Sequence, residues 1–398
     1  MPRAATFVIF LTIACAIVAG VHFYFWTRLV RDTQLAGWAR TAGTALFTTL
    51  ATLVVASVML RRVWPIIGTV LAWPGFIWMG AMFILLVILL SIDFLHVVGV
   101  LASRVSGVTF LSEVFRLVST KRILASVALL GTTAVTAAAV YTTRTDVKVK
   151  QIDIILDRLP RGLDGTRLVM MSDLHVGGLL GRDFVEKVTA TANRLDADAI
   201  VIVGDLVDDS IERLRPTLAP LAGLHARHGV FFVTGNHEYY TPSPTRAWLA
   251  EIERMGIHVL HNRHVTIDSE RGSFDLAGVA DHGAARFPNE GPREDVGQAL
   301  AGRDPSRVVV LLAHQPKTVF EAAKHGVDLQ LSGHTHGGQI QPWGALVRLQ
   351  QPFVRGLHRL GPTQIYVSNG TGFWGPPMRL FAPAEVTEIV LRASGRSP

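Results

Sequence analysis

The residues "DLQLSGHTHGGQI" (328–340) decide the fold of the second part of the chain. A short apolar run ends at residue 332, and His334 and His336 follow it in a glycine-rich loop. The preceding run, "VVVLLA" (308–313), is followed in the same way by His314. Short apolar runs of this kind predict buried strands, and ligand-binding side chains collect at the carboxyl ends of such strands. We therefore expect the three histidines to converge on one site.

The same pattern extends from residue 147 toward the C-terminus. Apolar runs lie at 166–171, 199–203, 230–234, 274–280, 308–313, 328–332, 364–368 and 385–391, and helices are expected at 182–195, 211–227, 243–255 and 317–325. Nearly unbroken apolar runs joined by helices indicate strands that are covered on both faces. This part of the chain is therefore predicted to be a layered α/β domain.

The first 145 residues have a different composition. Four stretches, at about 6–26, 41–60, 66–92 and 123–141, approach or exceed the roughly 20 apolar residues that a bilayer-spanning helix needs. We expect a transmembrane region at 1–145 with about four spans, followed by the α/β domain at 146–398. The only cysteine, Cys15, lies within the first stretch, so no internal disulfide can form.

Charge follows the same division. Residues 1–146 contain 11 Lys and Arg against four Asp and Glu, which accounts for the whole formal charge of +7. The remaining residues are neutral on balance, which argues against nucleic-acid binding by the α/β domain. The basic residues flank the apolar stretches instead, so membrane lipids are the expected partners of this region.

The segment "STKRILASVALLGTTAVTAAAVY" (119–141) bears on membrane orientation. Its basic pair, moderately apolar stretch and small residues resemble a twin-arginine export signal. This interpretation places the α/β domain outside the cytoplasm and the protein in the plasma (inner) membrane of a bacterium. An ordinary fourth span is the alternative. The Lys and Arg of the connecting segments, seven on one side against six on the other, favour neither.

Five of the apolar runs are followed directly by metal-binding residue types. The residues are Asp173 and His175, Asp205 and Asp208, Asn236 and His237, His314, and His334 and His336. Imidazole nitrogens mixed with carboxylate and amide oxygens suit Mn, Fe or Zn, and the absence of thiolates argues against a structural zinc site. These nine residues offer more donors than one tetrahedral ion needs, so two divalent ions sharing a carboxylate are expected. Paired ions of this kind, about 3.5 to 4 Å apart, are suited to displacement at phosphorus.

The order of these motifs, D-x-H, G-D-x-x-D, G-N-H-E, H and G-H-x-H, resembles that of the calcineurin-like metallophosphoesterases. The tail "YVSNGTGFWGPPMRLFAPAEVTEIVL" (366–391) resembles their bacterial membrane-associated branch. The resemblance covers about residues 150–392. It implies two β-sheets that are packed together and flanked by helices.

The resemblance also implies a role for each motif residue. Asp173, His175 and His336 would bind the first metal, Asn236, His314 and His334 would bind the second, and Asp205 would bridge the two. His237 would contact the phosphate and protonate the leaving oxygen, and Asp208 would orient site residues rather than bind metal. The arginine that often follows this motif in the family is absent, because Asp209 and Ser210 stand there.

The expected function is a membrane-anchored, dinuclear-metal phosphoesterase, specifically a phosphodiesterase. The expected substrate is a phosphate ester, and a lipid-linked ester is one candidate. One alternative is a pyrophosphatase acting on a nucleotide-linked lipid of the UDP-diacylglucosamine type. Another, from a different class, is a membrane sensor whose phosphoesterase domain binds a ligand without turning it over. The sequence does not indicate the oligomeric state.

Two further features are open to more than one interpretation. Asp93 and His96 lie near the end of the third apolar stretch, where ionisable groups form either a polar site or simple interfacial exposure. Residues 342–361 combine Trp343 and Leu349 with three arginines. They form either a cap that rests on anionic lipid or a strand and loop packed on the domain.

Overall fold

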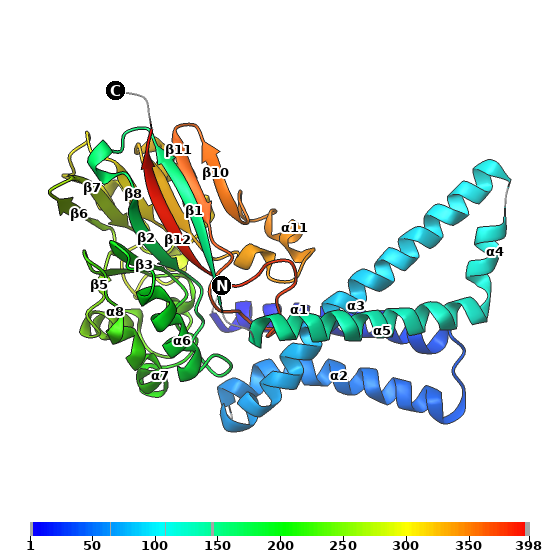
Figure 1. The fold of residues 1–398 in the computed structure, drawn as a ribbon. Helices are drawn as coiled ribbons and strands as arrows, with labels where there is room; N and C mark the ends of the chain where they lie inside the picture. The colour runs from blue at the N-terminus through cyan, green and yellow to red at the C-terminus, as the bar shows by residue number, and fades with distance from the viewer. Residues whose placement is uncertain (1–2, 64, 108, 145–146, 395–398) are drawn as a thin grey trace. The chain divides into compact units, whose positions relative to one another are not determined.

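The computed structural model describes residues 3–63, 65–107, 109–144 and 147–394 (Figure 1). The chain divides into two compact units. The first comprises Met1–Tyr141 with Gly375–Met378, and the second comprises Thr142–Trp374 with Arg379–Pro398.

The regular structure of the first unit is helical. Its helices are α1 (Arg3–Trp26), which continues as a π-helical turn over Thr27–Arg31, α2 (Gly37–Val63), α3 (Pro65–Ser106), α4 (Phe110–Arg116) and α5 (Val118–Arg144). Four segments are long and apolar enough to cross a membrane: Leu11–Arg31, Gly37–Leu60, Val70–Ser106 and Val118–Arg144. The four expected spans are therefore present as helices. Close packing of α2 on α3 requires Gly75, because a Cβ atom there would lie 2.4 Å from Cβ of Ser57.

The third helix is longer than expected. The sequence predicts an end at about residue 92, before Asp93, but α3 continues to Ser106. Asp93 accepts hydrogen bonds from the Arg28 guanidinium and, at 2.7 Å, from the hydroxyl of Tyr24. In the sequence, the charge of Asp93 indicated the end of the span. The ion pair with Arg28 neutralises this charge, so the helix continues past Asp93.

The second unit contains two six-stranded sheets. The first sheet has the order β1-β12-β2-β3-β4-β5, and its strands are β1 (Lys148–Leu156), β2 (Thr166–Met171), β3 (Ala199–Val203), β4 (Val230–Val233), β5 (His258–Val259) and β12 (Glu385–Ala393). The second has the order β10-β11-β9-β8-β7-β6, with β6 (Arg263–Ser269), β7 (Gly272–Gly278), β8 (Val309–Leu312), β9 (Leu329–Ser332), β10 (Gly356–Leu360) and β11 (Thr363–Val367).

Alternation along the strands builds two apolar layers on the first sheet. Leu168, Val201 and Phe231 face the second sheet and pack with Phe274 and Leu331 in the core between the sheets. The neighbouring residues of the same strands face outward. There they pack against α6 (Arg182–Asn193), α7 (Ile211–Leu218) and α8 (Thr245–Arg254). On the outer face of the second sheet, α9 (Val296–Ala299) and α10 (Val319–Lys324) contribute to a smaller core.

The predicted fold class is confirmed: two sheets pack together and helices flank them (Figure 1). All eight predicted runs form strands, but β1, β5, β6 and β10 were not predicted. The helix expected at 211–227 is shorter. It ends at Leu218 and gives way to a 3-10 turn at Ala219–Gly223, because Pro220 lacks the amide hydrogen that would continue the helix.

Strand direction determines which edge of the sheet carries the loops. Strands β2, β3 and β4 are parallel, and β12 runs antiparallel to β2, with Thr387 opposite Met170. Strand β1 is parallel to β12, with Lys148 opposite Glu385. The first residue of β1 therefore lies at the edge of the sheet where β2, β3 and β4 end.

Candidate metal centre

The loops after five parallel strands carry the predicted site residues. Strands β2, β3 and β4 of the first sheet are followed by Asp173 and His175, by Asp205 and Asp208, and by Asn236 and His237. Strands β8 and β9 of the second sheet are followed by His314 and by His334 and His336. The structure brings these side chains together in groups whose donor atoms lie within 4.8 Å of one another. The first group is Asp173, His175 and His336, and the second group is Asp205, His314 and His334. Asp208 and His237 lie equally close to His175 of the first group.

The first group presents nitrogen lone pairs toward one point. His175 Nε2 lies 3.1 Å from His336 Nε2, and His336 Nε2 lies 3.4 Å from Oδ1 of Asp173. Asp208 Oδ1 lies 3.1 Å from His175 Nδ1, where it accepts the ring proton. The proton on Nδ1 leaves Nε2 with a free lone pair, which is the arrangement of a metal-binding histidine.

In the second group, Nδ1 of His314 is likewise held in a hydrogen bond. Its Nδ1 donates to the carbonyl oxygen of Val203 at 2.8 Å, and its Nε2 lies 3.1 Å from Oδ2 of Asp205. Despite that distance, the His314 Nε2 atom is buried without a hydrogen-bond partner, and so is Oδ1 of Asn236. Buried polar atoms of this kind are rare in folded proteins, and an ion is one of the partners that explains them.

Asp205 lies between the two groups. Its Oδ2 is 3.1 Å from His314 Nε2 and 3.7 Å from His175 Nε2. No other carboxylate of these groups approaches a histidine of both within the described residues. One carboxylate placed in this way is what two neighbouring cations would share.

Burial sets the charge state of two of the candidate ligand histidines. Burial lowers the pKa of His334 to about 3, and the charge of His314 adds to this shift. Burial, followed by His175, also holds the pKa of His336 well below its usual range. Both rings are therefore neutral and offer lone pairs. Burial would also lower the pKa of His314, but Asp205 outweighs it and raises that pKa well above the usual value. A cation at Asp205 would therefore displace a proton from His314. In donor type, burial and unpaired atoms, the residues fit divalent metal ions.

The backbone of the site is held in an uncommon conformation. Asp173, His175, Asp205, His334 and His336 all have positive φ, between 47° and 70°. Left-handed backbone outside glycine costs energy and persists where the surrounding structure enforces it, which is often at functional sites.

Glycines allow the loops to approach the donors. A Cβ atom on Gly235 would lie 2.2 Å from Oδ1 of Asp205, and one on Gly333 would lie 2.3 Å from Oδ2 of Asp173. Gly204 has a φ of +77°, and a Cβ there would lie 2.5 Å from Nδ1 of His314. No side chain fits at these positions without moving a donor.

Comparison with known proteins decides the family. A family profile described as "Calcineurin-like phosphoesterase" matches residues 166–338. An "Uncharacterized metallophosphoesterase" of Aquifex aeolicus is 34% identical over 251 residues, which are 63% of this chain and 93% of that protein. The chain belongs to the calcineurin-like phosphoesterases.

Two other members of the family extend the likeness. An "Uncharacterized metallophosphoesterase" of Helicobacter pylori is 42% identical over 246 residues, which are 61% of this chain and 64% of that protein. A "Transmembrane protein with metallophosphoesterase domain" of Danio rerio is 40% identical over 251 residues, or 62% and 57% of the two chains. The chain thus spans less than two thirds of the length of these two relatives. Because one of them is from a fish, the likeness is not confined to the bacterial branch.

Glu238 also belongs to this phosphoesterase site. It is the last residue of the motif G-N-H-E, but the sequence alone indicated no role for it. Its buried carboxylate accepts the backbone N–H groups of Gly235 at 2.6 Å, Leu206 at 2.7 Å and Asp205 at 3.1 Å. It thereby joins the loops that follow β3 and β4. Burial, followed by the charge of Asp205, raises the pKa of Glu238 to about 7. Its place in the motif G-N-H-E was the available signal.

Arg379 was missed altogether. The side chain is 2% exposed, and its guanidinium donates to the carbonyl oxygens of Ala382 at 2.8 Å and Gly372 at 3.1 Å. It also lies 3.4 Å from Nδ1 of His336. Single-sequence reasoning places arginine on the surface, so nothing in the sequence indicated this buried position.

Two exposed aromatic rings stand beside His237. Tyr240 is 48% exposed with its ring centroid 5.4 Å from that of His237, and Trp374 is 55% exposed at 5.7 Å. Both meet the imidazole edge to face. Residues 342–361 form α11 (Trp343–Val347) and the edge strand β10, and expose Leu346 and Leu349. Contact of this segment with lipid stays a prediction.

Proposed function

We propose that this protein is a membrane-anchored phosphoesterase that uses two divalent metal ions, Mn, Fe or Zn. Asp173, His175 and His336 would hold one ion, Asn236, His314 and His334 would hold the other, and Asp205 would serve both. The proposal depends above all on the position of Oδ2 of Asp205 between the two groups of buried donors. When bound, paired ions of this kind stabilise charge on phosphoryl oxygens and lower the pKa of water.

His237 is proposed to deliver the proton to the leaving oxygen. Asp208 accepts the Nδ1 proton at 2.6 Å, which fixes the ring and directs Nε2 away from the carboxylate. Burial alone would lower the pKa of His237, but Asp205 and then Asp208 outweigh it and raise that pKa to about 9. The ring is therefore protonated at neutral pH, although cations bound at Asp205 would oppose part of this rise. A proton donor in this position suits general acid catalysis.

The natural substrate is proposed to be a phosphodiester that is linked to a lipid. Two features support this choice. Helix α5 ends at Arg144 and β1 begins at Lys148, so the chain passes from an apolar span into the domain at the sheet edge that carries the site. The exposed rings of Tyr240 and Trp374 offer apolar surface beside the proton donor for the alcohol part of a substrate. We further propose a place in the inner membrane of a bacterium, with the phosphoesterase domain outside the cytoplasm.

Metal content and hydrolysis test the proposal together. The full-length protein in detergent should bind about two metal ions per chain and hydrolyse bis-p-nitrophenyl phosphate with added Mn, and a chelator should abolish turnover. Asp205→Asn should lose both metal and activity. Asp209→Asn, which removes a neighbouring carboxylate that pairs with Arg213 outside the site, is the matched control and should retain both.

The alternatives predict other outcomes of the same measurements. Faster turnover of p-nitrophenyl phosphate than of the diester would contradict the phosphodiesterase assignment. Cleavage of a nucleotide-linked lipid at its pyrophosphate, with no cleavage of simple diesters, would identify a pyrophosphatase. Bound metal without turnover of any ester would identify a membrane sensor.

A further inference from the structure

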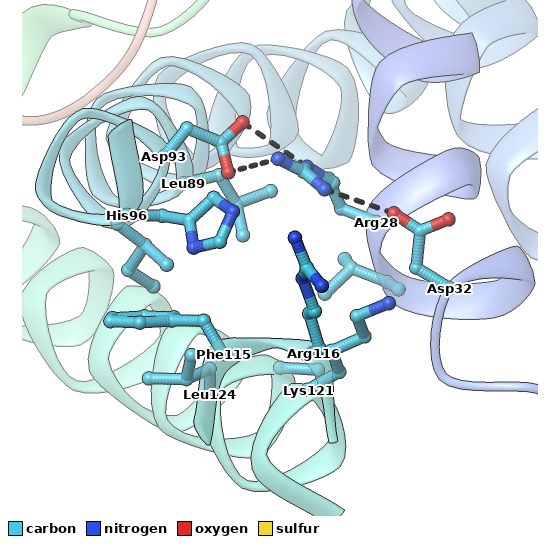
Figure 2. A pocket seen from close by; sticks show the side chains of 12 residues that line it. Arg28, Asp32, Leu89, Asp93, His96, Phe115, Arg116, Lys121 and Leu124 are labelled. Atoms are coloured by element: carbon cyan, nitrogen blue, oxygen red, sulfur yellow. Dashed lines mark hydrogen bonds and ion pairs between the residues drawn. The ribbon is translucent and has the colours of Figure 1, made fainter. Parts of the chain in front are cut away.

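The helical unit contains a cavity of about 170 Å³ that the phosphoesterase chemistry does not use (Figure 2). It is lined by residues from the end of the first span, from α3, and from the α4 and α5 segments. A single water molecule takes about 30 Å³ in the liquid, so the cavity has room for a larger group.

The two carboxylates in the cavity already have cationic partners. Arg28 donates to Asp32 at 3.0 Å and to both carboxylate oxygens of Asp93. Asp93 also accepts from the hydroxyl of Tyr24 at 2.7 Å, and Asp32 pairs with Arg31 at 3.0 Å. The hydrogen bonds and ion pairs of both carboxylates are therefore made with neighbouring protein side chains.

Two further cations enter the cavity from the opposite side. Figure 2 shows Arg116 and Lys121 pointing toward the Arg28 and Asp32 pair, with His96 turned inward beside them. Among the residues that the structure describes, neither the Arg116 guanidinium nor the Lys121 ammonium has a side-chain hydrogen bond or an ion pair. The Nδ1 atom of His96 is likewise buried without a partner. Two cations without anionic partners, Arg116 and Lys121, and a polar nitrogen without a partner make an anion the complementary ligand.

The surroundings of the cavity select an amphiphilic anion. Arg28 lies in the last turns of the span that ends at Arg31, and Lys121 lies in the first turn of the span that begins at Val118. Next in sequence to the cavity residues Asp93, Arg116 and Leu124, the apolar side chains of Phe94, Leu117 and Ile123 are 67%, 54% and 63% exposed. Basic residues at the ends of spans with apolar side chains next to them match a lipid, whose charged headgroup adjoins its acyl chains.

We propose that this cavity binds the phosphate group of an anionic lipid at the bilayer interface. The fork of the Arg116 guanidinium suits two phosphate oxygens, and Lys121 supplies a second positive charge. Free phosphate offers the same chemistry without the acyl chains. The site is independent of the metal centre, so its occupancy is measured by binding rather than by hydrolysis.

The test uses the full-length protein in detergent and native mass spectrometry. Phosphatidylglycerol, phosphatidylcholine and inorganic phosphate are titrated separately. Wild type should retain one phosphatidylglycerol per chain in preference to phosphatidylcholine. The double variant R116Q/K121Q should bind it about tenfold or more weakly, because each cation near a membrane surface is worth about 1 kcal/mol. The matched control is R40Q/R104Q, which removes two exposed cations of α2 and α3 that lie outside the cavity. It should change affinity by less than about twofold.

The outcomes separate the site from its alternatives. Tight binding of phosphatidylglycerol with weak binding of inorganic phosphate supports a lipid as the ligand, whereas equal binding of both supports free phosphate in the same site. An equal loss of affinity in both double variants would show diffuse attraction and overturn the proposal. The wild-type titration decides the matter even if R116Q/K121Q is not recovered, because uptake without saturation, or without preference over phosphatidylcholine, also overturns it.

Discussion

Asp208 Oδ1 lies 2.6 Å from Nδ1 of His237 and so sets the orientation of a ring whose centroid lies 4.5 Å from that of His175. The same oxygen lies 3.1 Å from Nδ1 of His175. One carboxylate therefore holds both a candidate metal ligand and the candidate proton donor. Burial opposes its ionisation, but His175 and His237 keep the pKa of Asp208 well below the usual range, so it remains an acceptor.

Replacing Asp208 with Asn should weaken the site without removing a donor from either group. The amide loses the negative charge that fixes both Nδ1 protons, so activity or metal affinity should fall about 10- to 100-fold. Steady-state kinetics and a metal titration of the purified variant measure the two effects. Wild-type values for both would show that this carboxylate has no orienting role.

The His237→Gln variant separates proton donation from other contributions. Turnover of a diester with an alkyl alcohol leaving group should fall by about 10² to 10⁴, which is the usual contribution of a general acid. Turnover of a p-nitrophenyl ester should fall less, because p-nitrophenolate leaves without needing a proton. The ratio of the two rates is the measurement. An equal loss with both leaving groups would contradict proton transfer by His237.

Gly235→Ala should prevent metal binding at the candidate centre. The added Cβ would lie 2.2 Å from Oδ1 of Asp205, closer than any real contact, so the shared carboxylate must move. We expect bound metal to fall below one ion per chain, as measured by elemental analysis. Gly223→Ala is the control, because a Cβ atom there meets nothing within 4 Å. Full metal content in Gly235→Ala would refute the close approach of this loop.

A pH-dependent stability effect is expected at Glu251, on α8 and outside the metal centre. Hydrogen bonds from Arg254 and Arg215, opposed by partial burial, lower the pKa of Glu251 to about 2. Because the folded pKa is depressed, the contribution should be complete above the unfolded value of 4.5 and should be lost as the pH falls toward 2. Both arginines are more than half exposed, so solvent screening limits the effect to about 1 kcal/mol or less.

The measurement compares thermal unfolding of wild type and Glu251→Gln at pH 6 and pH 3. The midpoint difference should be larger at pH 6. Glu253→Gln, on the same helix but 55% exposed and 3.5 Å from Arg263, should change little at either pH. A difference that grows on acidification would have the wrong sign for this ion pair.

The sequence predicted the donor groups better than the elements around them. Asp173 follows the apolar run of β2, and His314 follows that of β8. Each strand is parallel to a neighbour in its own sheet, and the packing of the two sheets brings the ends of these strands together. Strand β1 was missed because "KVKQIDIIL" mixes charged and apolar residues, and its outer positions are exposed at the edge of the sheet. The burial of Glu238 and Arg379 depends on contacts between loops that are far apart in the chain. No local sequence pattern indicates such contacts.

The left-handed backbone at five of the donor positions limits the residue types that these positions accept. Asp, Asn and His tolerate this conformation better than other residues with side chains, and they are also the residues that bind cations. The same residue types thus satisfy both the left-handed backbone conformation and the need for a metal-binding side chain. Glutamate carries the same carboxylate on a longer side chain. The positive φ alone disfavours it at Asp173 and Asp205, whatever the effect of its length. Amino-acid substitutions at these positions are therefore expected to be limited to a few residue types, even where the surrounding loops vary in sequence.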